Sequence, residues 1–292
     1  MAELWLVRLV EVVLGAATCA ALLLVAFPRE RPWRVAARTL KLTVASRRRL
    51  LYVAACVAVL AFNCAWLASG LDERCTAWVE QRWGRDDFAG LFYHYLEGGA
   101  VARLQAALAT PVLTWALGFV YVVVFPCLGI VALLVFDHLR DRQGLAMVLI
   151  GYLVDFAILL PFCVVFPVLE VHAFYARHPE LEPAARLLLD DITPTVMRAY
   201  RGMSGLDNCF PSFHTSLAVT LALLSWRAGR RLFGAVFTSA AAANVFATLY
   251  LGIHWVSDVA AGVASGLVAY AAARRLSRPW AQEGDRPETE GE

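Results

Sequence analysis

Charged side chains are scarce in this sequence: Asp, Glu, Lys and Arg together make up 17% of its 292 residues, whereas a soluble globular domain carries about 25%. This shortage excludes a disordered chain, collagen, a coiled coil and an ordinary cytosolic enzyme. Lys41 is the only lysine among 26 basic residues, and the net charge of +2 gives no indication of a nucleic-acid partner. Seven cysteines are too few for a disulfide scaffold in a chain of this length.

What the sequence does contain is long hydrophobic runs. Hydrophobic residues make up 60% of the chain, and the mean hydropathy is +0.61. A run of about 20 apolar residues can cross the ~30 Å hydrocarbon core of a bilayer as a helix. The sequence therefore predicts an all-α, polytopic membrane bundle. About seven spans are expected, at 4–27, 50–69, 109–136, 145–170, 212–226, 232–251 and 255–273.

The distribution of basic residues predicts the orientation of the bundle. Of the 26 Lys and Arg residues, 17 lie in four segments on one side of the membrane: 28–49, 137–144, 227–231 and the tail after residue 273. Cytoplasmic loops carry such an excess of positive charge. We therefore expect the N-terminus outside, the C-terminus in the cytoplasm, and an integral protein of the plasma membrane.

The pattern of polar and apolar residues divides the chain into three parts. Residues 1–144 hold the first spans and the segment 71–108, whose mixed aromatic and charged residues are typical of the outer membrane interface. That segment is either a packed external loop or a lid over a site. Residues 145–275 are expected to form a catalytic membrane core. Residues 276–292 are acidic, lack apolar periodicity and are expected to form a disordered cytoplasmic tail.

Two short polar stretches stand next to the last three spans. Residues 208–216 read Asn-Cys-Phe-Pro-Ser-Phe-His-Thr-Ser, and residues 250–258 read Tyr-Leu-Gly-Ile-His-Trp-Val-Ser-Asp. The tight basic turn at 227–231 makes the two spans that flank it antiparallel neighbours. His214 and His254 are therefore expected at the same level of the membrane, on its external side.

The residue types in these stretches suit phosphate chemistry. His254 and Asp258 are four residues apart and share one face of a helix. An aspartate that accepts from one imidazole nitrogen fixes the tautomer and leaves the other nitrogen free as a nucleophile or base. Ser212 lies at the first turn of a helix, where free N–H groups favour a phosphate. Taken singly, each motif is also explained by an interfacial histidine without a catalytic role.

Together the two stretches carry a family resemblance. Pro-Ser-x-His-Thr-Ser, followed by Gly-x-His-x-x-x-Asp-x-x-Ala-Gly, resembles the type 2 phosphatidic acid phosphatase superfamily. The resemblance covers roughly residues 145–275 and is strongest to the branch near the inositol phosphorylceramide synthases and sphingomyelin synthases. It implies a six-helix phosphatase-like core, or a reduced version of it, with an additional N-terminal span.

The resemblance also implies a role for each site residue. His254 would attack phosphorus to give a phosphohistidine, His214 would protonate the leaving oxygen, and Asp258 would orient the nucleophile. Ser212 would contact the phosphate. No cofactor and no metal ion is implied.

The sequence departs from the superfamily in its phosphate-binding cations. The Lys and Arg pair expected before the middle motif is absent, and Thr248 stands where an Arg is expected six residues before the nucleophile. A phosphoryl dianion still needs positive charge. Arg198 and Arg201 are the first choices to supply it, because they lie nearest to the middle motif in the loop 171–211. The alternative is that they are solvated loop arginines.

Three functions follow as alternatives. The first is hydrolysis of a lipid phosphomonoester or polyprenyl diphosphate at the external membrane face. The second is transfer of a phospho-headgroup, of the inositol phosphate type, between lipid and alcohol acceptors. The third is a transporter or scaffold that has lost the chemistry, against which the retained residues His214, His254 and Asp258 argue. The expected partners are a lipid phosphate and the bilayer; the sequence indicates no oligomeric state.

Buried polar positions add two further expectations. Asp155 lies within an apolar span, where it is expected to pair with Asn63 or Asn244 or to contact substrate. Cys75 and Cys209 both lie in external loops, so they either form a disulfide or, in the case of Cys209, pack beside the motif.

Overall fold

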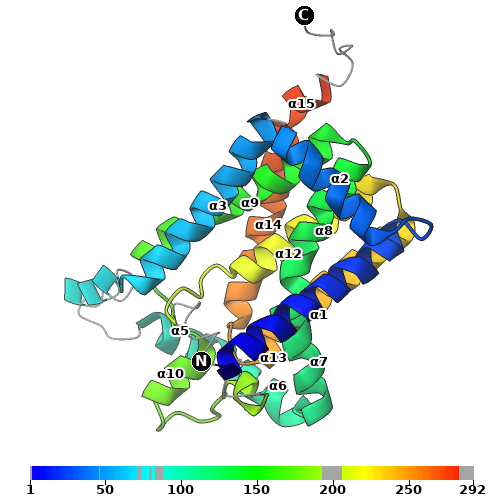
Figure 1. Cartoon of the computed structure of the whole chain (residues 1–292). Helices are drawn as coiled ribbons and strands as arrows, with labels where there is room; N and C mark the ends of the chain where they lie inside the picture. The colour runs from blue at the N-terminus through cyan, green and yellow to red at the C-terminus, as the bar shows by residue number, and fades with distance from the viewer. Residues whose placement is uncertain are drawn as a thin grey trace, which may run out of the picture.

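The computed structural model describes residues 2–45, 47–70, 74–75, 77–78, 81–82, 88–192 and 206–282. These residues form helices joined by turns, without a strand among them apart from one isolated bridge between Val168 and Asn208 (Figure 1). The α-helices are α1 (Ala2–Ala26), α2 (Pro32–Ala45), α3 (Arg47–Ala68), α5 (Phe88–Glu97), α6 (Ala100–Leu108), α7 (Pro111–Phe119), α8 (Phe125–His138), α9 (Arg142–Val165), α10 (Val171–Arg177), α12 (Phe213–Ser225), α13 (Arg231–Tyr250), α14 (Val256–Leu276) and α15 (Arg278–Gln282). One π-helical turn, η1 (Val120–Val124), and two 3₁₀ turns, η2 (Leu188–Asp191) and η3 (Trp226–Ala228), complete the set.

Five stretches of the described helices are long and apolar enough to cross a membrane: Leu9–Ala26, Pro111–His138, Arg142–Phe162, Arg231–Tyr250 and Val256–Leu276. They confirm the prediction of an all-α polytopic bundle. Of the other two expected spans, 50–69 coincides with α3. The span expected at 212–226 is α12, whose 13 residues extend only ~20 Å at 1.5 Å per residue. Alone, α12 is too short to cross a ~30 Å core.

Helix α12 lies at the centre of the bundle, packed against α9, α13 and α14 (Figure 1). Its contact with α14 depends on two glycines, Gly262 and Gly266. A Cβ added at Gly262 would lie 2.6 Å from the carbonyl oxygen of Ser212, and one added at Gly266 would lie 2.5 Å from that of Ser216. Small residues spaced four apart let helix backbones approach closely in membranes. The first turns of α12 are thereby held directly against α14.

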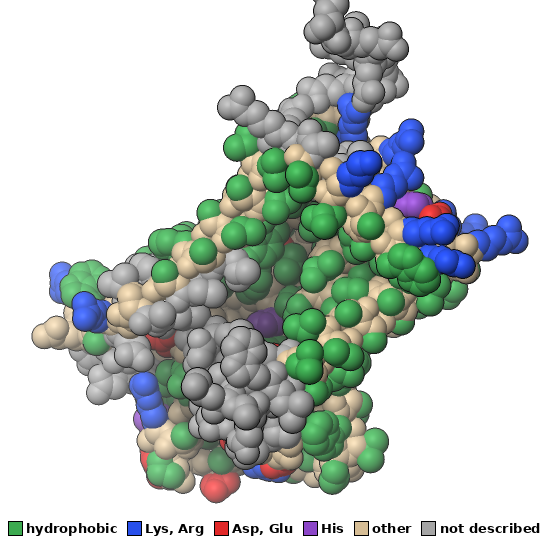
Figure 2. Space-filling model, viewed as in Figure 1, with side chains coloured by type: hydrophobic (Ala, Val, Ile, Leu, Met, Phe, Trp, Pro, Cys, Tyr) green, Lys and Arg blue, Asp and Glu red, His purple; other side chains and the backbone are tan. Residues whose placement is uncertain are grey.

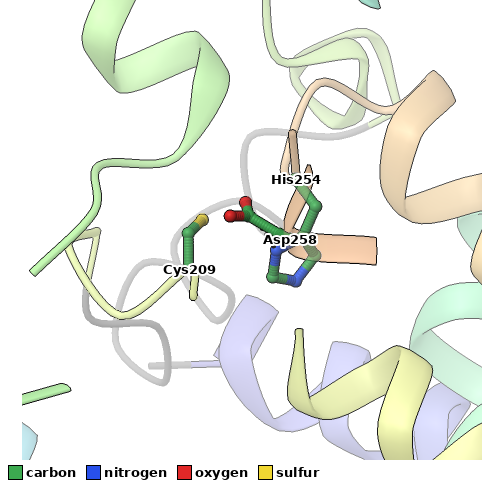
Figure 3. Close-up of side chains that lie close together, drawn as sticks. All are labelled: Cys209, His254 and Asp258. Atoms are coloured by element: carbon green, nitrogen blue, oxygen red, sulfur yellow. Dashed lines mark ion pairs between the residues drawn. The ribbon is translucent and has the colours of Figure 1, made fainter. Parts of the chain in front are cut away.

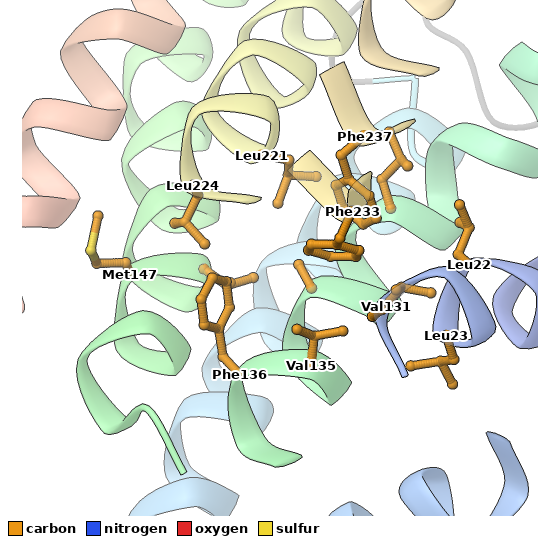
Figure 4. Close-up of a cluster of buried hydrophobic side chains, with 14 of the residues drawn as sticks. Leu22, Leu23, Val131, Val135, Phe136, Met147, Leu221, Leu224, Phe233 and Phe237 are labelled. Atoms are coloured by element: carbon orange, nitrogen blue, oxygen red, sulfur yellow. The ribbon is translucent and has the colours of Figure 1, made fainter. Parts of the chain in front are cut away.

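A large apolar core joins α12 and α13 to α1, α8 and α9 (Figure 4). Burying a Leu or Phe side chain contributes about 1.5–3 kcal/mol relative to exposing it. In this core the rings of Phe233 and Phe237 lie 4.3 Å apart, centroid to centroid. Other members are Leu22, Leu23, Val131, Val135, Phe136, Met147, Leu221 and Leu224. The core fixes the α12–α13 hairpin, as expected from the tight turn between these helices.

Short helices cover one end of the bundle. In Figure 1, α5, α6 and α10 lie at the end opposite α2 and α15. Their apolar side chains form a second core around Trp255, which contains Tyr93, Phe174 and Tyr175. The indole nitrogen of Trp255 donates to the carbonyl of Leu169 at 2.9 Å. Residues 88–108 of the segment 71–108 are therefore packed over the bundle end that carries both polar stretches.

The surface of the bundle is apolar along its sides and basic at one end. Figure 2 shows a hollow between α1 and α3 whose walls are mostly hydrophobic. In the same view, Lys and Arg side chains gather at the end where α2 lies. This is the end predicted to face the cytoplasm, and the orientation of the chain stays a prediction.

Helical structure extends further into the C-terminal tail than the composition of the tail predicts. Residues 276–282, expected to be disordered, complete α14 and form α15. The expectation was wrong for this stretch because Trp280 packs against the large apolar core and Ser277 is fully buried. Residues 283–292 lie outside the described residues.

Candidate active site

His254 and Asp258 form the pair that their spacing predicts. Atom Nδ1 of His254 lies 3.5 Å from Oδ2 of Asp258 (Figure 3). The two residues are 4% and 0% exposed. The same carboxylate oxygen accepts from the backbone N–H of Trp255 at 2.9 Å, so Asp258 also caps its own helix. Burial lowers the pKa of His254. The ring is therefore held neutral, with a lone pair available for attack.

The turn between α13 and α14 sets the position of His254. The carbonyl of Thr248 accepts from the amides of Ile253 and His254, both at 3.1 Å, so the chain folds back onto the last turn of α13. Gly252 makes this possible with φ of +81°, a region that favours glycine. A Cβ there would also lie 2.4 Å from the carbonyl oxygen of Arg186. Glycine is required on both grounds.

The two polar stretches meet through backbone hydrogen bonds. The amide of Ser212 donates to the carbonyl of Asp258 at 3.1 Å. The hydroxyl of Ser212 accepts from the amide of Thr215 at 3.3 Å and forms the N-cap of α12. Ser212 is fully buried. The start of α12 is thereby tied to the first turn of α14, where the sequence places the nucleophile.

His214 lies on the first turn of α12, beside His254. The two ring centroids are 6.2 Å apart. The His214 ring also packs against Tyr121, at 4.7 Å, and Phe125, at 4.9 Å. The structure thus brings His214, His254 and Asp258 together, as predicted.

A π-helical turn places Tyr121 against His214. In η1 the amide of Phe125 donates to the carbonyl of Val120. Pro126, which follows, has no N–H to donate. Such π turns often occur at functional sites. The sequence analysis did not single out Tyr121 or Phe125, although Pro126 within an apolar run was a signal for an irregular helix.

Glu97 is a further residue at the site that the sequence analysis missed. Its carboxylate accepts from the amides of Val256 at 3.0 Å and Ser257 at 2.8 Å, the first turn of α14. A negative charge is stabilised at a helix N-terminus. No local sequence pattern indicates this contact, because Glu97 lies on α5.

The described residues supply no obvious replacement for the missing phosphate-binding cations. Thr248, at the position of the expected Arg, is fully buried, and its hydroxyl donates to the carbonyl of Val245 at 2.8 Å. The Arg186 guanidinium makes two 2.7 Å bonds to Asp191 and is 62% exposed. Arg198 and Arg201, the first choices on sequence, lie outside the described residues.

Asp155 and Cys209 both form hydrogen bonds within the described residues. Asp155 is buried on α9 and accepts a hydrogen bond from the hydroxyl of Ser216 on α12. Cys209 and Cys75 are not joined to each other, so the disulfide considered from the sequence is not formed. The Cys209 thiol donates to the carbonyl of Ile253 at 3.3 Å, and it packs beside the motif.

One group of side chains among the described residues has donors suited to a metal ion. It consists of the Cys209 sulfur, an imidazole nitrogen of His254 and a carboxylate oxygen of Asp258, all within 4.8 Å of one another (Figure 3). The expectation from sequence is a site without metal, and the group is considered further below.

Comparison with known proteins gives one match. Residues 94–272 match the family model of the PAP2 superfamily. The match includes both polar stretches and begins on α5, so it also takes in Glu97, Tyr121 and Phe125. No curated protein and no solved structure matches the chain.

Proposed function

The chain belongs to the PAP2 superfamily, whose members are phosphoesterases, and from this premise we propose that it is a membrane lipid phosphatase that works through a phosphohistidine at His254. The substrate is a lipid phosphomonoester or a polyprenyl diphosphate. The observation that carries the proposal is the placement of His254 beside Asp258 on one side and His214 on the other.

The first half of the reaction forms the phosphohistidine. Nε2 of His254 attacks phosphorus while Asp258, next to Nδ1, stabilises the positive charge that develops on the ring. The bond between phosphorus and the leaving oxygen breaks. In this proposal His214 takes up a proton when the phosphate anion binds beside it and gives that proton to the leaving oxygen, so the lipid leaves as a neutral alcohol. With a diphosphate substrate, the leaving group is the lipid monophosphate.

The second half regenerates the enzyme. Deprotonated His214 accepts a proton from water as the water attacks phosphorus. The phosphorus–nitrogen bond breaks and phosphate leaves. Ser212 and the amides at the start of α12 are the groups that contact phosphate oxygens in this proposal, because a helix N-terminus favours an anion.

The apolar surroundings support a lipid substrate. A groove of about 460 Å³ lies between α1 and the η1–α8 segment, and its lining includes Val12, Val122, Val123 and Ile130. Val122 follows Tyr121, whose ring stacks on His214. A hydrocarbon chain in this groove would therefore run close to the site. We propose that the site lies at the external face of the plasma membrane, because the Lys and Arg residues gather in the loops on the opposite side.

Headgroup transfer is the second candidate function. It is favoured by Thr248, which replaces a phosphate-binding Arg, and by the resemblance to the branch near inositol phosphorylceramide and sphingomyelin synthases. In that reaction an alcohol, rather than water, attacks the intermediate at His254.

One assay separates these functions. Purified protein is given a panel of lipid phosphates and polyprenyl diphosphate, with and without inositol or a lipid alcohol. Hydrolysis releases free phosphate whether or not an acceptor is present, whereas transfer depends on the acceptor and yields inositol phosphate or the phosphomonoester of the lipid alcohol. His254→Ala should abolish either activity and the acid-labile phosphoenzyme. Normal turnover by this variant would end the proposal.

A further inference from the structure

The group formed by Cys209, His254 and Asp258 has leftover bonding capacity. Atom Nδ1 of His254 and atom Oδ1 of Asp258 are buried and make no hydrogen bond within the described structure. The three side chains are 1%, 4% and 0% exposed. Buried polar atoms are nearly always paired, so these two atoms, in side chains that lie beside the Cys209 thiol, have capacity to bind a ligand.

The types of donor atom in this group indicate which metal ion it can bind. A thiolate, an imidazole and a carboxylate are ligands of Zn²⁺, whereas Mg²⁺ prefers a shell of oxygens. Tetrahedral Zn²⁺, with bonds of about 2.0–2.3 Å, holds neighbouring donors roughly 3.5 Å apart. The imidazole of His254 and the carboxylate of Asp258 already have a 3.5 Å separation. The Cys209 sulfur lies within 4.8 Å of both donor atoms, so it has to move closer to them to bind the same ion.

We propose that Cys209, His254 and Asp258 bind one Zn²⁺ ion and that this ion inhibits the enzyme. The thiol of Cys209 loses its proton to solvent and gives up its hydrogen bond to Ile253. The ion takes the lone pair of Nδ1 of His254, and the proton of that ring moves to Nε2. A water or a backbone group completes the coordination.

Inhibition follows from the tautomer of His254. Attack on phosphorus requires a lone pair on Nε2, and zinc at Nδ1 leaves Nε2 with a proton instead. The same ion draws the Asp258 carboxylate away from its role in orienting the ring. The binding of zinc rests on the donor geometry alone, whereas inhibition rests also on the proposed function.

The test compares wild-type protein with Cys209→Ser and Cys209→Val. Cys56→Ser is the matched control, since Cys56 is a free, partly buried thiol on α3. Zn²⁺ is titrated into lipid phosphate hydrolysis, and binding of Co²⁺ is followed separately by its thiolate charge-transfer absorption. We expect wild type and Cys56→Ser to be inhibited by Zn²⁺, reversibly with EDTA, and to show the cobalt band. Both Cys209 variants should hydrolyse lipid phosphate without zinc, need at least ~10-fold more Zn²⁺ for inhibition, and lack the band.

The outcomes distinguish this inference from the proposed function. A cobalt band that depends on Cys209, in protein that hydrolyses no lipid phosphate, supports the metal site and counts against the phosphatase. Hydrolysis without a cobalt band, or with equal zinc sensitivity in wild type and both Cys209 variants, overturns the metal site and leaves the phosphatase standing.

Discussion

Atom Oε1 of Glu97 lies 2.8 Å from the backbone nitrogen of Ser257, although 160 residues separate the two in the chain. The contact joins α5 to the first turn of α14, one turn from the proposed nucleophile. It offers the free amides of that turn a full negative charge, which the helix dipole favours.

Removal of this cap should destabilise the protein measurably. Glu97→Ala leaves two amides of α14 without their acceptor, and we expect the free energy of unfolding to fall by about 1 kcal/mol. Glu97→Gln should lower the free energy of unfolding less, because the side-chain amide oxygen of Gln can still accept a hydrogen bond from the α14 amides. Thermal unfolding in detergent measures both. Glu180→Ala, which removes an exposed pair with His178, should change the free energy of unfolding little. If Glu180→Ala destabilises the protein as much as Glu97→Ala, the loss in Glu97→Ala does not come from the contact with α14.

The close contact of α12 and α14 predicts a difference between two helical glycines. Gly262→Ala would place a methyl group 2.6 Å from the Ser212 carbonyl, and we expect a loss of about 1–3 kcal/mol together with reduced turnover. Gly129→Ala on α8 meets nothing within 4 Å and should be neutral or stabilising by up to about 1 kcal/mol. Unfolding and turnover of the two variants are compared in the same detergent. Equal stability and equal turnover of the two variants would contradict the close contact between the backbones of α12 and α14.

Loop arginines are expected to replace the missing cations. We predict that Arg198→Ala or Arg201→Ala lowers kcat at least ~10²-fold, since the phosphoryl transition state otherwise lacks a counter-charge. A Lys at the same position should restore only part of the lost kcat, because its ammonium group cannot donate to two phosphate oxygens in the bidentate geometry of a guanidinium. Arg186→Ala, which breaks an exposed pair with Asp191, should have a much milder effect. Normal kcat in both loop variants would mean that the cation comes from elsewhere.

Labelling in intact cells tests the orientation. In a Cys75→Ser background, a cysteine in place of exposed Glu180 should react with a membrane-impermeant maleimide, because its loop is predicted to be external. A cysteine in place of exposed Arg230, in the basic turn before α13, should react only after the membrane is permeabilised. The reverse pattern would move the active site to the cytoplasmic face.

Local sequence patterns predicted the parts of the site that depend on neighbours along one helix or one hairpin. His254 and Asp258 are four residues apart, so helix geometry alone brings them together. His214 meets His254 because a tight turn makes α12 and α13 antiparallel. The sequence analysis did not single out the Gly262–Gly266 pair, although two glycines four apart in an apolar run are typical of close helix packing in membranes.

The remaining contacts are set by tertiary packing and have no local signature. Glu97 caps a helix that begins far along the chain, and its partners are backbone amides that any residue supplies. Tyr121 stacks on His214 from within a π turn, and although Pro126 signals an irregular helix, it does not indicate which side chain meets His214. Trp280 orders a segment whose composition resembles a tail, since packing of one large side chain outweighs a weak local preference.

The shortness of α12 has a consequence for substrate choice. Its 13 residues run beside the 20 of α13, so from their shared turn α12 ends about 10 Å short of its neighbour. A phosphate ester dissolved in water would have to shed its hydration over that depth, with no hydrocarbon to compensate. A lipid phosphate starts at the headgroup level next to the site, with its hydrocarbon chains already in the apolar core. Under the proposed function, the preference for lipid substrates therefore follows from the depth at which α12 begins in the membrane. It does not depend on any contact with the headgroup.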